Sequence, residues 1–210
     1  MQSFSLPEPP KTRKQKLKEE TEGRKLSLKP PKYIKTVRDL IYWLYAELIA
    51  RAAGFEGNYG FVVSRFKKLK SGEMSWSSSI RDWQKELEKG RVCTYCGSRE
   101  SLSVDHMIPI SRAITPKIKG LLESQDNCVL ACKACNSKKG DRDVFEWYDK
   151  NRLDEIPKLV LSKFLKLAYR LHELQDTLDL EDPNTDGVTD IYDLGIAITF
   201  LIKKGRGSGK

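Results

Sequence analysis

The 210-residue chain contains only two histidines and five cysteines, and it has no apolar run long enough to cross a membrane. Its most apolar stretch, residues 40–50, includes Glu47 and is far shorter than the roughly 20 apolar residues of a membrane-spanning helix. No N-terminal segment has the length and flanks of a signal peptide. These absences predict a cytoplasmic protein with no membrane partner.

Basic residues are missing from one part of the chain and concentrated in another. Residues 171–202 contain eight acidic residues and no Lys or Arg, whereas residues 1–35 contain ten Lys or Arg against four Glu. The whole chain carries a net charge of +9. Lys and Arg release counterions when they contact phosphates, so the charge favours a nucleic-acid partner, although a solvated basic surface would give the same balance.

The first 90 residues divide by composition into a tail and a helical region. Residues 1–35 are rich in proline and poor in apolar groups, which predicts a disordered basic tail. The tail is either a solubilising leader or an arm along the DNA backbone. Residues 36–90 are predicted to be helical, because Leu40, Leu44 and Leu48 recur at helical spacing before Gly54. Further helices are predicted over roughly 61–70 and 79–90.

The C-terminal part of the chain is also predicted to be helical. Apolar residues return at helical spacing over 144–178, and the predicted C-terminal helical region spans 146–202. The last residues, 203–210, are rich in Lys and Gly and predict a frayed basic tail.

Four of the five cysteines form two Cys-x-x-Cys pairs, Cys93/Cys96 and Cys132/Cys135, which bracket 35 residues. Zn²⁺ is bound tetrahedrally by four thiolates, and such a closed site is structural because it leaves no open position. The pattern therefore predicts a structural zinc ion, with two disulfides as the alternative. Cys128 is left over and is interpreted as a small buried residue on a strand.

One histidine lies inside the segment that the cysteines bracket. Asp105 and His106 follow an apolar stretch, Asn127 opens a second apolar stretch, and Asn136 lies nine residues later in Cys-Asn-Ser-Lys-Lys-Gly. Each residue alone has a structural interpretation: a histidine can be buried filler, Asp-His can cap a turn, and Asn136 can cap a helix. The alternative is that the four residues form a catalytic site together.

At these residues the sequence resembles the zinc-binding subgroup of the HNH endonuclease family, over 91–145. The resemblance implies a ββα-metal module in which His106 is the general base and Asn127 anchors the loop between the strands. Asp105 and Asn136 are then the ligands of a catalytic Mg²⁺ or Mn²⁺, and the products carry 5′-phosphate and 3′-hydroxyl ends. The chain has Asn where the family name expects a last His.

The implied chemistry is consistent with the residue types. An imidazole has an ordinary pKa of about 6.5, so it can take a proton from water at physiological pH. Mg²⁺ prefers oxygen ligands and completes its shell with water and substrate phosphate. Nearby basic residues are predicted to contact flanking phosphates: Lys138, Lys139 and Arg142.

A second metal loop is predicted at residues 182–193, which fit the EF-hand template and resemble the calcium loop of dockerin-type modules. Its ligands would be Asp182, Asn184, Asp186, Val188, Asp190 and Asp193. The loop is single where such loops usually pair, and an Asx/Gly-rich turn between two helices is the alternative.

Together these observations predict an α+β, mostly helical protein, in which helices flank a small zinc-stapled ββα-metal module. The predicted function is metal-dependent cleavage of double-stranded or branched DNA, with a homodimer left open. One alternative is a non-catalytic zinc-ribbon DNA-binding module. The other is a calcium-dependent protein-interaction adaptor.

Overall fold

A computed structural model of the chain describes residues 30–75, 90–148, 152, 155–182, 187, 189 and 194. The predicted N-terminal tail up to residue 29, almost all of the predicted helix over 79–90, and the C-terminal tail lie outside these residues. Most of the predicted calcium loop lies outside them as well.

The described residues form a mixed α/β structure with six α-helices and one antiparallel hairpin. This confirms the predicted class. The hairpin consists of β1 (Leu102–His106) and β2 (Cys128–Cys132), with Leu102 opposite Cys132 and His106 opposite Cys128. The helices are α2 (Val37–Ala52), α3 (Tyr59–Lys70), α5 (Pro116–Leu122), α6 (Lys133–Lys139), α7 (Val144–Tyr148) and α8 (Lys158–Leu174).

Local signals explain where α2 and α3 begin and end. The hydroxyl of Thr36 accepts a hydrogen bond from the Asp39 amide, and the side chain of Asn58 accepts one from the Phe61 amide. Each satisfies an amide that the first helical turn leaves without a partner. Beyond the end of α2 the chain turns at Gly54, whose φ of +74° suits glycine. The two helices match the predicted ones.

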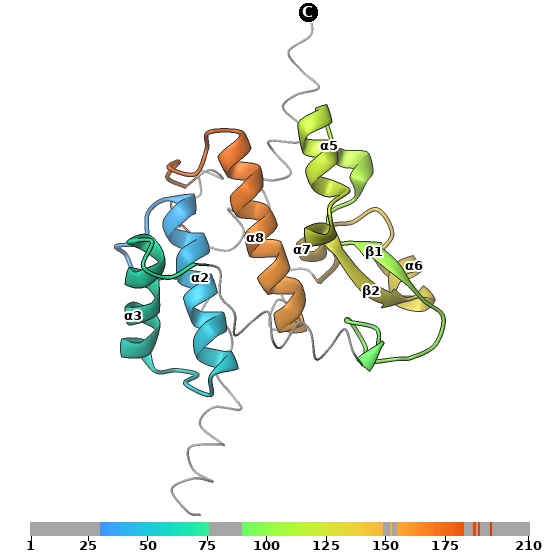
Figure 1. Cartoon of the computed structure of the whole chain (residues 1–210), viewed down its shortest axis with the longest axis horizontal. Coiled ribbons are helices and arrows are strands. Elements are labelled where there is room, and N and C mark those ends of the chain that lie inside the picture. The colour runs from blue at the N-terminus through green and yellow to red at the C-terminus, as the bar shows by residue number, and fades with distance from the viewer. Residues whose placement is uncertain are drawn as a thin grey trace, which may run out of the picture.

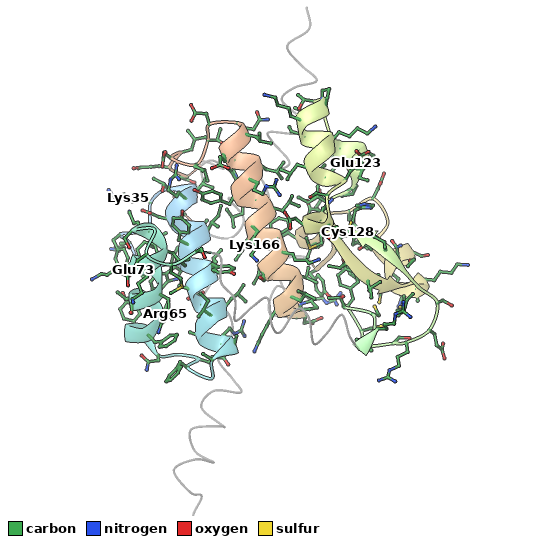
Figure 2. All side chains as sticks on the ribbon, in the orientation of Figure 1. Lys35, Arg65, Glu73, Glu123, Cys128 and Lys166 are labelled. Carbon is green, nitrogen blue, oxygen red and sulfur yellow. The ribbon has the colours of Figure 1, made fainter. Side chains whose placement is uncertain are left out.

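The long helix α8 lies in the middle of the molecule, between the α2–α3 pair and the part that contains the hairpin (Figure 1). It contacts α2 on one side and α5 on the other. Its buried residues include Val160, Phe164, Leu167 and Leu171, and side chains fill the space between the helices (Figure 2). One core therefore joins the helical part to the hairpin. In the described residues, no helix combines the length and apolarity that a bilayer crossing requires.

The segment between the two strands contains α5, a helix that the sequence analysis did not predict. Thr115 caps it by accepting from the Ile118 amide, and Pro116 stands at its first position, where its missing N–H is no loss. The helix buries Ile118, Leu121 and Leu122. It packs against α8 and thereby attaches the loop between the strands to the core.

Candidate active site

The four predicted zinc ligands lie together. The Sγ atoms of Cys93, Cys96, Cys132 and Cys135 all lie within 4.8 Å of one another, and all four are free thiols. Four sulfurs at ~2.3 Å from one tetrahedral zinc ion lie about 3.8 Å apart, and the Sγ atoms of Cys96 and Cys132 are 3.7 Å apart. The cluster therefore fits a structural zinc ion and not two disulfides.

Hydrogen bonds from backbone amides shape both halves of this cluster. The Gly97 amide donates to the Cys93 carbonyl at 2.8 Å, which closes the first turn, and Gly97 has a φ of +76°. In the second pair, Cys132 caps α6 by accepting from the Cys135 amide. That amide lowers the pKa of the Cys132 thiol to about 7, which favours the thiolate form that binds metal. Asn136 is thus inside α6 and is not its cap.

Asn127 closes the loop that joins the two strands. Its side chain is fully buried, and its Oδ1 accepts from the Ile108 amide at 2.9 Å. Its Nδ2 donates to the carbonyls of Ile108 at 2.8 Å and Leu122 at 2.7 Å. Because Ile108 follows β1 and Leu122 ends α5, one amide side chain holds both ends of the loop beside His106.

His106 is the last residue of β1 and lies opposite Cys128 on β2. It is half-buried, and its ring accepts or donates no hydrogen bond within the described part of the chain. Side chains of consecutive strand residues point to opposite faces, so His106 stands apart from the buried side chain of Asp105. The ring is partly open to solvent at the end of the strand.

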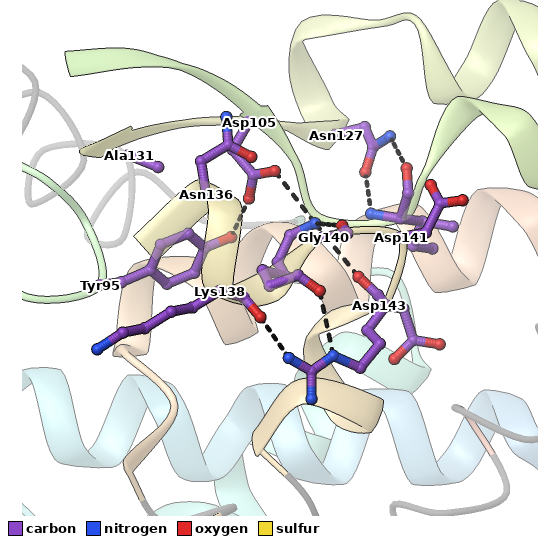
Figure 3. A network of polar contacts seen from close by, with 12 residues as sticks. Tyr95, Asp105, Asn127, Ala131, Asn136, Lys138, Gly140, Asp141 and Asp143 are labelled. Carbon is purple, nitrogen blue, oxygen red and sulfur yellow. Dashed lines mark hydrogen bonds and ion pairs between the residues drawn. The ribbon is translucent and has the colours of Figure 1, made fainter. Parts of the chain in front are cut away.

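The carboxylate of Asp105 has a partner at each oxygen (Figure 3). Its Oδ1 is 3.1 Å from the ammonium of Lys139, and its Oδ2 accepts a hydrogen bond of 2.6 Å from the hydroxyl of Tyr95. Asp105 is 4% exposed and Lys139 is 2% exposed. Burial, and then the neighbouring carboxylate, raise the pKa of Tyr95 far above its usual range, so the phenol stays a donor.

Asn136 lies one helical turn before Lys139 on the face of α6 that packs against β1. Its Nδ2 donates to the Ser103 hydroxyl at 3.3 Å. Ser103 and Asp105 share one face of β1, so Asn136 and Asp105 come from neighbouring positions of the helix–strand contact. Amide and carboxylate oxygens are the ligand types that a hard divalent cation prefers, and both oxygens of Asp105 also have protein partners, Lys139 and Tyr95.

The three basic residues predicted to contact phosphates lie in different surroundings. Lys138 is exposed and extends away from Asp105 (Figure 3). Arg142 is exposed, but its guanidinium donates to the carbonyls of Lys138 and Lys139 at the end of α6. Lys139 is buried against Asp105 and also donates to the Arg142 carbonyl at 3.2 Å. Lys139 is therefore a buried counter-charge to Asp105, and it is not a surface residue that could contact a phosphate.

Two residues of this region were missed by sequence reasoning. Tyr95 stands between the first two cysteines, where only the cysteines attracted attention. Arg112, after β1, contacts Asp143 at 3.2 Å and Glu146. The signal in the sequence was the same for both, a large polar side chain beside a motif. The spacing of the residues did not indicate which partner each side chain would contact.

Of the predicted calcium loop, the structure describes Asp182 and Gly187. The Oδ2 of Asp182 accepts from the Gly187 amide at 2.8 Å, and Gly187 has a φ of +81°. The Oδ1 of Asp182 is buried without a hydrogen-bond partner among the described residues. The other predicted ligands, Asn184, Asp186, Val188, Asp190 and Asp193, lie outside the residues that the structure describes.

Comparison with known families agrees with this geometry. Residues 93–142 match the family model of the HNH endonuclease. The match begins at the first cysteine of the cluster and includes both strands and α6, which confirms the resemblance seen in the sequence. It supports a nuclease-type, DNA-binding function for this part of the chain. Neither the search of curated proteins nor the search of solved structures found a significant match.

Proposed function

We propose that the protein is a metal-dependent DNA endonuclease in which His106 is the general base. The observation that carries this proposal is the HNH match over 93–142, in which the half-buried His106 ends β1 directly after the buried Asp105, with the two side chains on opposite faces of the strand. The non-catalytic zinc-ribbon alternative has no use for Asp105, His106 and Asn136 in one hairpin–helix unit.

In the proposed reaction, the His106 ring takes a proton from a water molecule that attacks the phosphorus of a phosphodiester. Asn127 does not touch the substrate; its three hydrogen bonds hold the loop that follows His106 and so hold the ring in place. Asp105 and Asn136 would hold the divalent ion. A bound Mg²⁺ or Mn²⁺ supplies Lewis-acid stabilisation of charge on the phosphate and on the departing 3′ oxygen.

The proposed substrate is double-stranded or branched DNA. The net charge of +9 supplies sequence-independent attraction to phosphates, and the exposed side chain of Lys138 is available for one such contact. Cleavage of both strands would need two active sites on one duplex, which a homodimer provides. The proposed site of action is the cytoplasm.

The decisive variant is His106→Ala. Removing the base should reduce cleavage of supercoiled plasmid in Mg²⁺ by at least about 100-fold, the lower end of what a general base contributes. DNA affinity in a mobility-shift assay and zinc content should be unchanged, because His106 is not one of the four cysteine ligands and its ring makes no hydrogen bond in the described part of the chain. Cleavage without Mg²⁺ should be absent in both proteins.

The other histidine offers a matched control. His172 lies on α8 and is fully buried, so His172→Gln should leave cleavage at neutral pH intact in the same preparation. If His106→Ala still cut as fast as the control, the assignment of the base would be wrong. Binding of DNA by the wild-type chain with no cleavage in Mg²⁺ or Mn²⁺ would instead favour the zinc-ribbon alternative.

We also propose that the loop at 182–193 binds Ca²⁺ as a structural ion. The hydrogen bond from the Gly187 amide to Asp182 supports it, and so does the buried, unpartnered Oδ1 of Asp182. Calorimetry should detect heat on adding Ca²⁺, and the melting temperature should rise because the ion binds only the folded loop. No heat and no rise would remove the calcium site and the calcium-dependent adaptor alternative with it.

A further inference from the structure

The carboxylate of Asp105 is held from two directions by segments that the cysteine cluster joins. Tyr95, which donates to Oδ2, lies between Cys93 and Cys96. Lys139, which contacts Oδ1, lies at the end of α6, the helix that Cys132 caps. The two halves of the proposed zinc site therefore each supply one of the two groups that hold Asp105.

The contact from Tyr95 has the features of a strong, directed hydrogen bond. Its length of 2.6 Å is that of a hydroxyl donating to a charged carboxylate. The ring packs edge-on against Trp147 of α7, with centroids 4.8 Å apart and planes at 89°. The Thr94 amide next to it donates to the Leu130 carbonyl on β2 at 2.8 Å. Tyr95 is thus held in place both by the backbone next to it and by the packing of its ring.

The burial of Asp105 and Lys139 explains why the direction of the Asp105 carboxylate matters. A buried carboxylate without partners is costly, so Asp105 adopts the position in which both oxygens are satisfied. The ammonium of Lys139 is shared between Asp105 and the carbonyls of Gly140 and Arg142, whereas the hydroxyl of Tyr95 is directed at the other oxygen of Asp105. Tyr95 therefore helps to set the direction in which Asp105 points along the α6 contact.

We infer that Tyr95 is a positioning residue: it transmits the geometry of the cysteine cluster to Asp105 and so tunes the divalent-ion site. The inference rests on the proposed function, because it takes Asp105 as a ligand of the catalytic ion. Groups that hydrogen-bond metal ligands typically change metal affinity or activity by about 10–100-fold when they are removed. Zinc would then influence the divalent-ion site in addition to stabilising the fold.

The test is Tyr95→Phe in the full-length, zinc-loaded chain. The ring and its packing on Trp147 remain, and only the hydroxyl is lost. Titration with Mn²⁺, followed by the electron paramagnetic resonance signal of the free ion, should give a dissociation constant raised roughly 10-fold or more. In cleavage assays at fixed Mn²⁺ the kcat should fall, while the KM for DNA and the zinc content should not change.

Tyr42→Phe is the matched control, because it also removes a partly buried hydroxyl with a side-chain partner, Tyr169 at 3.3 Å, in the helical part of the protein. It should bind Mn²⁺ as the wild type does. If both variants bound Mn²⁺ equally, the positioning role of Tyr95 would be refuted even in an active nuclease. A wild-type chain that bound Mn²⁺ without cleaving DNA would overturn the proposed function alone, and one that bound no Mn²⁺ would overturn both.

Discussion

His172 is a buried histidine whose environment excludes the charged form. Its Nδ1 is 2.9 Å from the Thr177 hydroxyl, and its Nε2 is buried without a partner in the described residues. Burial lowers the pKa of His172 to about 4. The folded protein therefore keeps this ring neutral at a pH where an unfolded chain has already taken up a proton.

The sign of the pH dependence follows from this difference. Between pH 6.5 and about 4 the unfolded state binds a proton that the native state does not, so the free energy of unfolding falls as the pH is lowered through this window. Above pH 6.5 the effect is absent. The full change amounts to about 3 kcal/mol for one such group. Urea unfolding at several pH values should show this loss.

Carboxylates also titrate in acid, so the comparison needs a variant without this imidazole. His172→Gln should flatten the stability profile between pH 6.5 and 4 relative to the wild type, whatever its stability at neutral pH. Parallel profiles for the two proteins would mean that His172 is protonated in the native state.

Candidate site residues could be proposed from the sequence where a motif specified them. The resemblance to HNH sequences singled out Asp105, His106, Asn127 and Asn136, and the structure places all four in the hairpin–helix unit. Lys139 was expected at the surface, because a lysine in a basic run usually faces solvent. It lies inside since it shares a helix face with Asn136 and meets the buried Asp105, a contact between segments that sequence order alone does not reveal.

At the scale of elements, Arg112 connects the segment after β1 to the start of α7. Its guanidinium contacts the Asp143 carboxylate, the Asp141 carbonyl at 2.9 Å and the Glu146 carboxylate. Asp143 is buried, and burial raises its pKa despite the neighbouring Arg112. Arg112 thus supplies the compensating charge at the place where the part that matches the HNH model joins the C-terminal helices.

Arg112→Met should destabilise the protein by about 3 kcal/mol, because it leaves a buried carboxylate without its cation. Chemical denaturation measures the loss. Lys119→Met is the matched control, since it breaks the exposed Lys119–Glu123 pair, and a pair of this kind contributes at most about 1 kcal/mol. Equal effects of the two substitutions would show that the Arg112 contacts carry no special weight.

Helices could be predicted where apolar residues recur at helical spacing and where capping residues mark the ends. The helical spacing of leucines indicated α2, and apolar periodicity indicated α8. The helix α5 was missed, because seven residues give too few turns for a periodic pattern and its Thr-Pro start was the only local signal. The helix α6 begins before Asn136, which the sequence offered as a possible cap, because the capping group is the thiol of Cys132, a residue considered only as a metal ligand.

At the scale of the whole molecule, α8 connects the N-terminal helices to the part that contains the hairpin. Its buried face contacts α2, while Lys163 on the same helix donates to the Cys128 carbonyl of β2 at 2.7 Å. The hairpin and its cysteine cluster therefore do not form a separate domain. The outermost helices of the N-terminal part and the proposed site are held by a common core.

The order of four cysteines, Asp-His and two asparagines along the chain was enough to predict the hairpin–helix unit and its cysteine cluster. Which polar groups meet inside that unit became visible in the folded structure alone. Tyr95, Asp105 and Lys139 come from three different segments, and their pairing depends on how α6 packs on β1. Such packing follows from the shape and burial of whole side chains, which a linear pattern does not record.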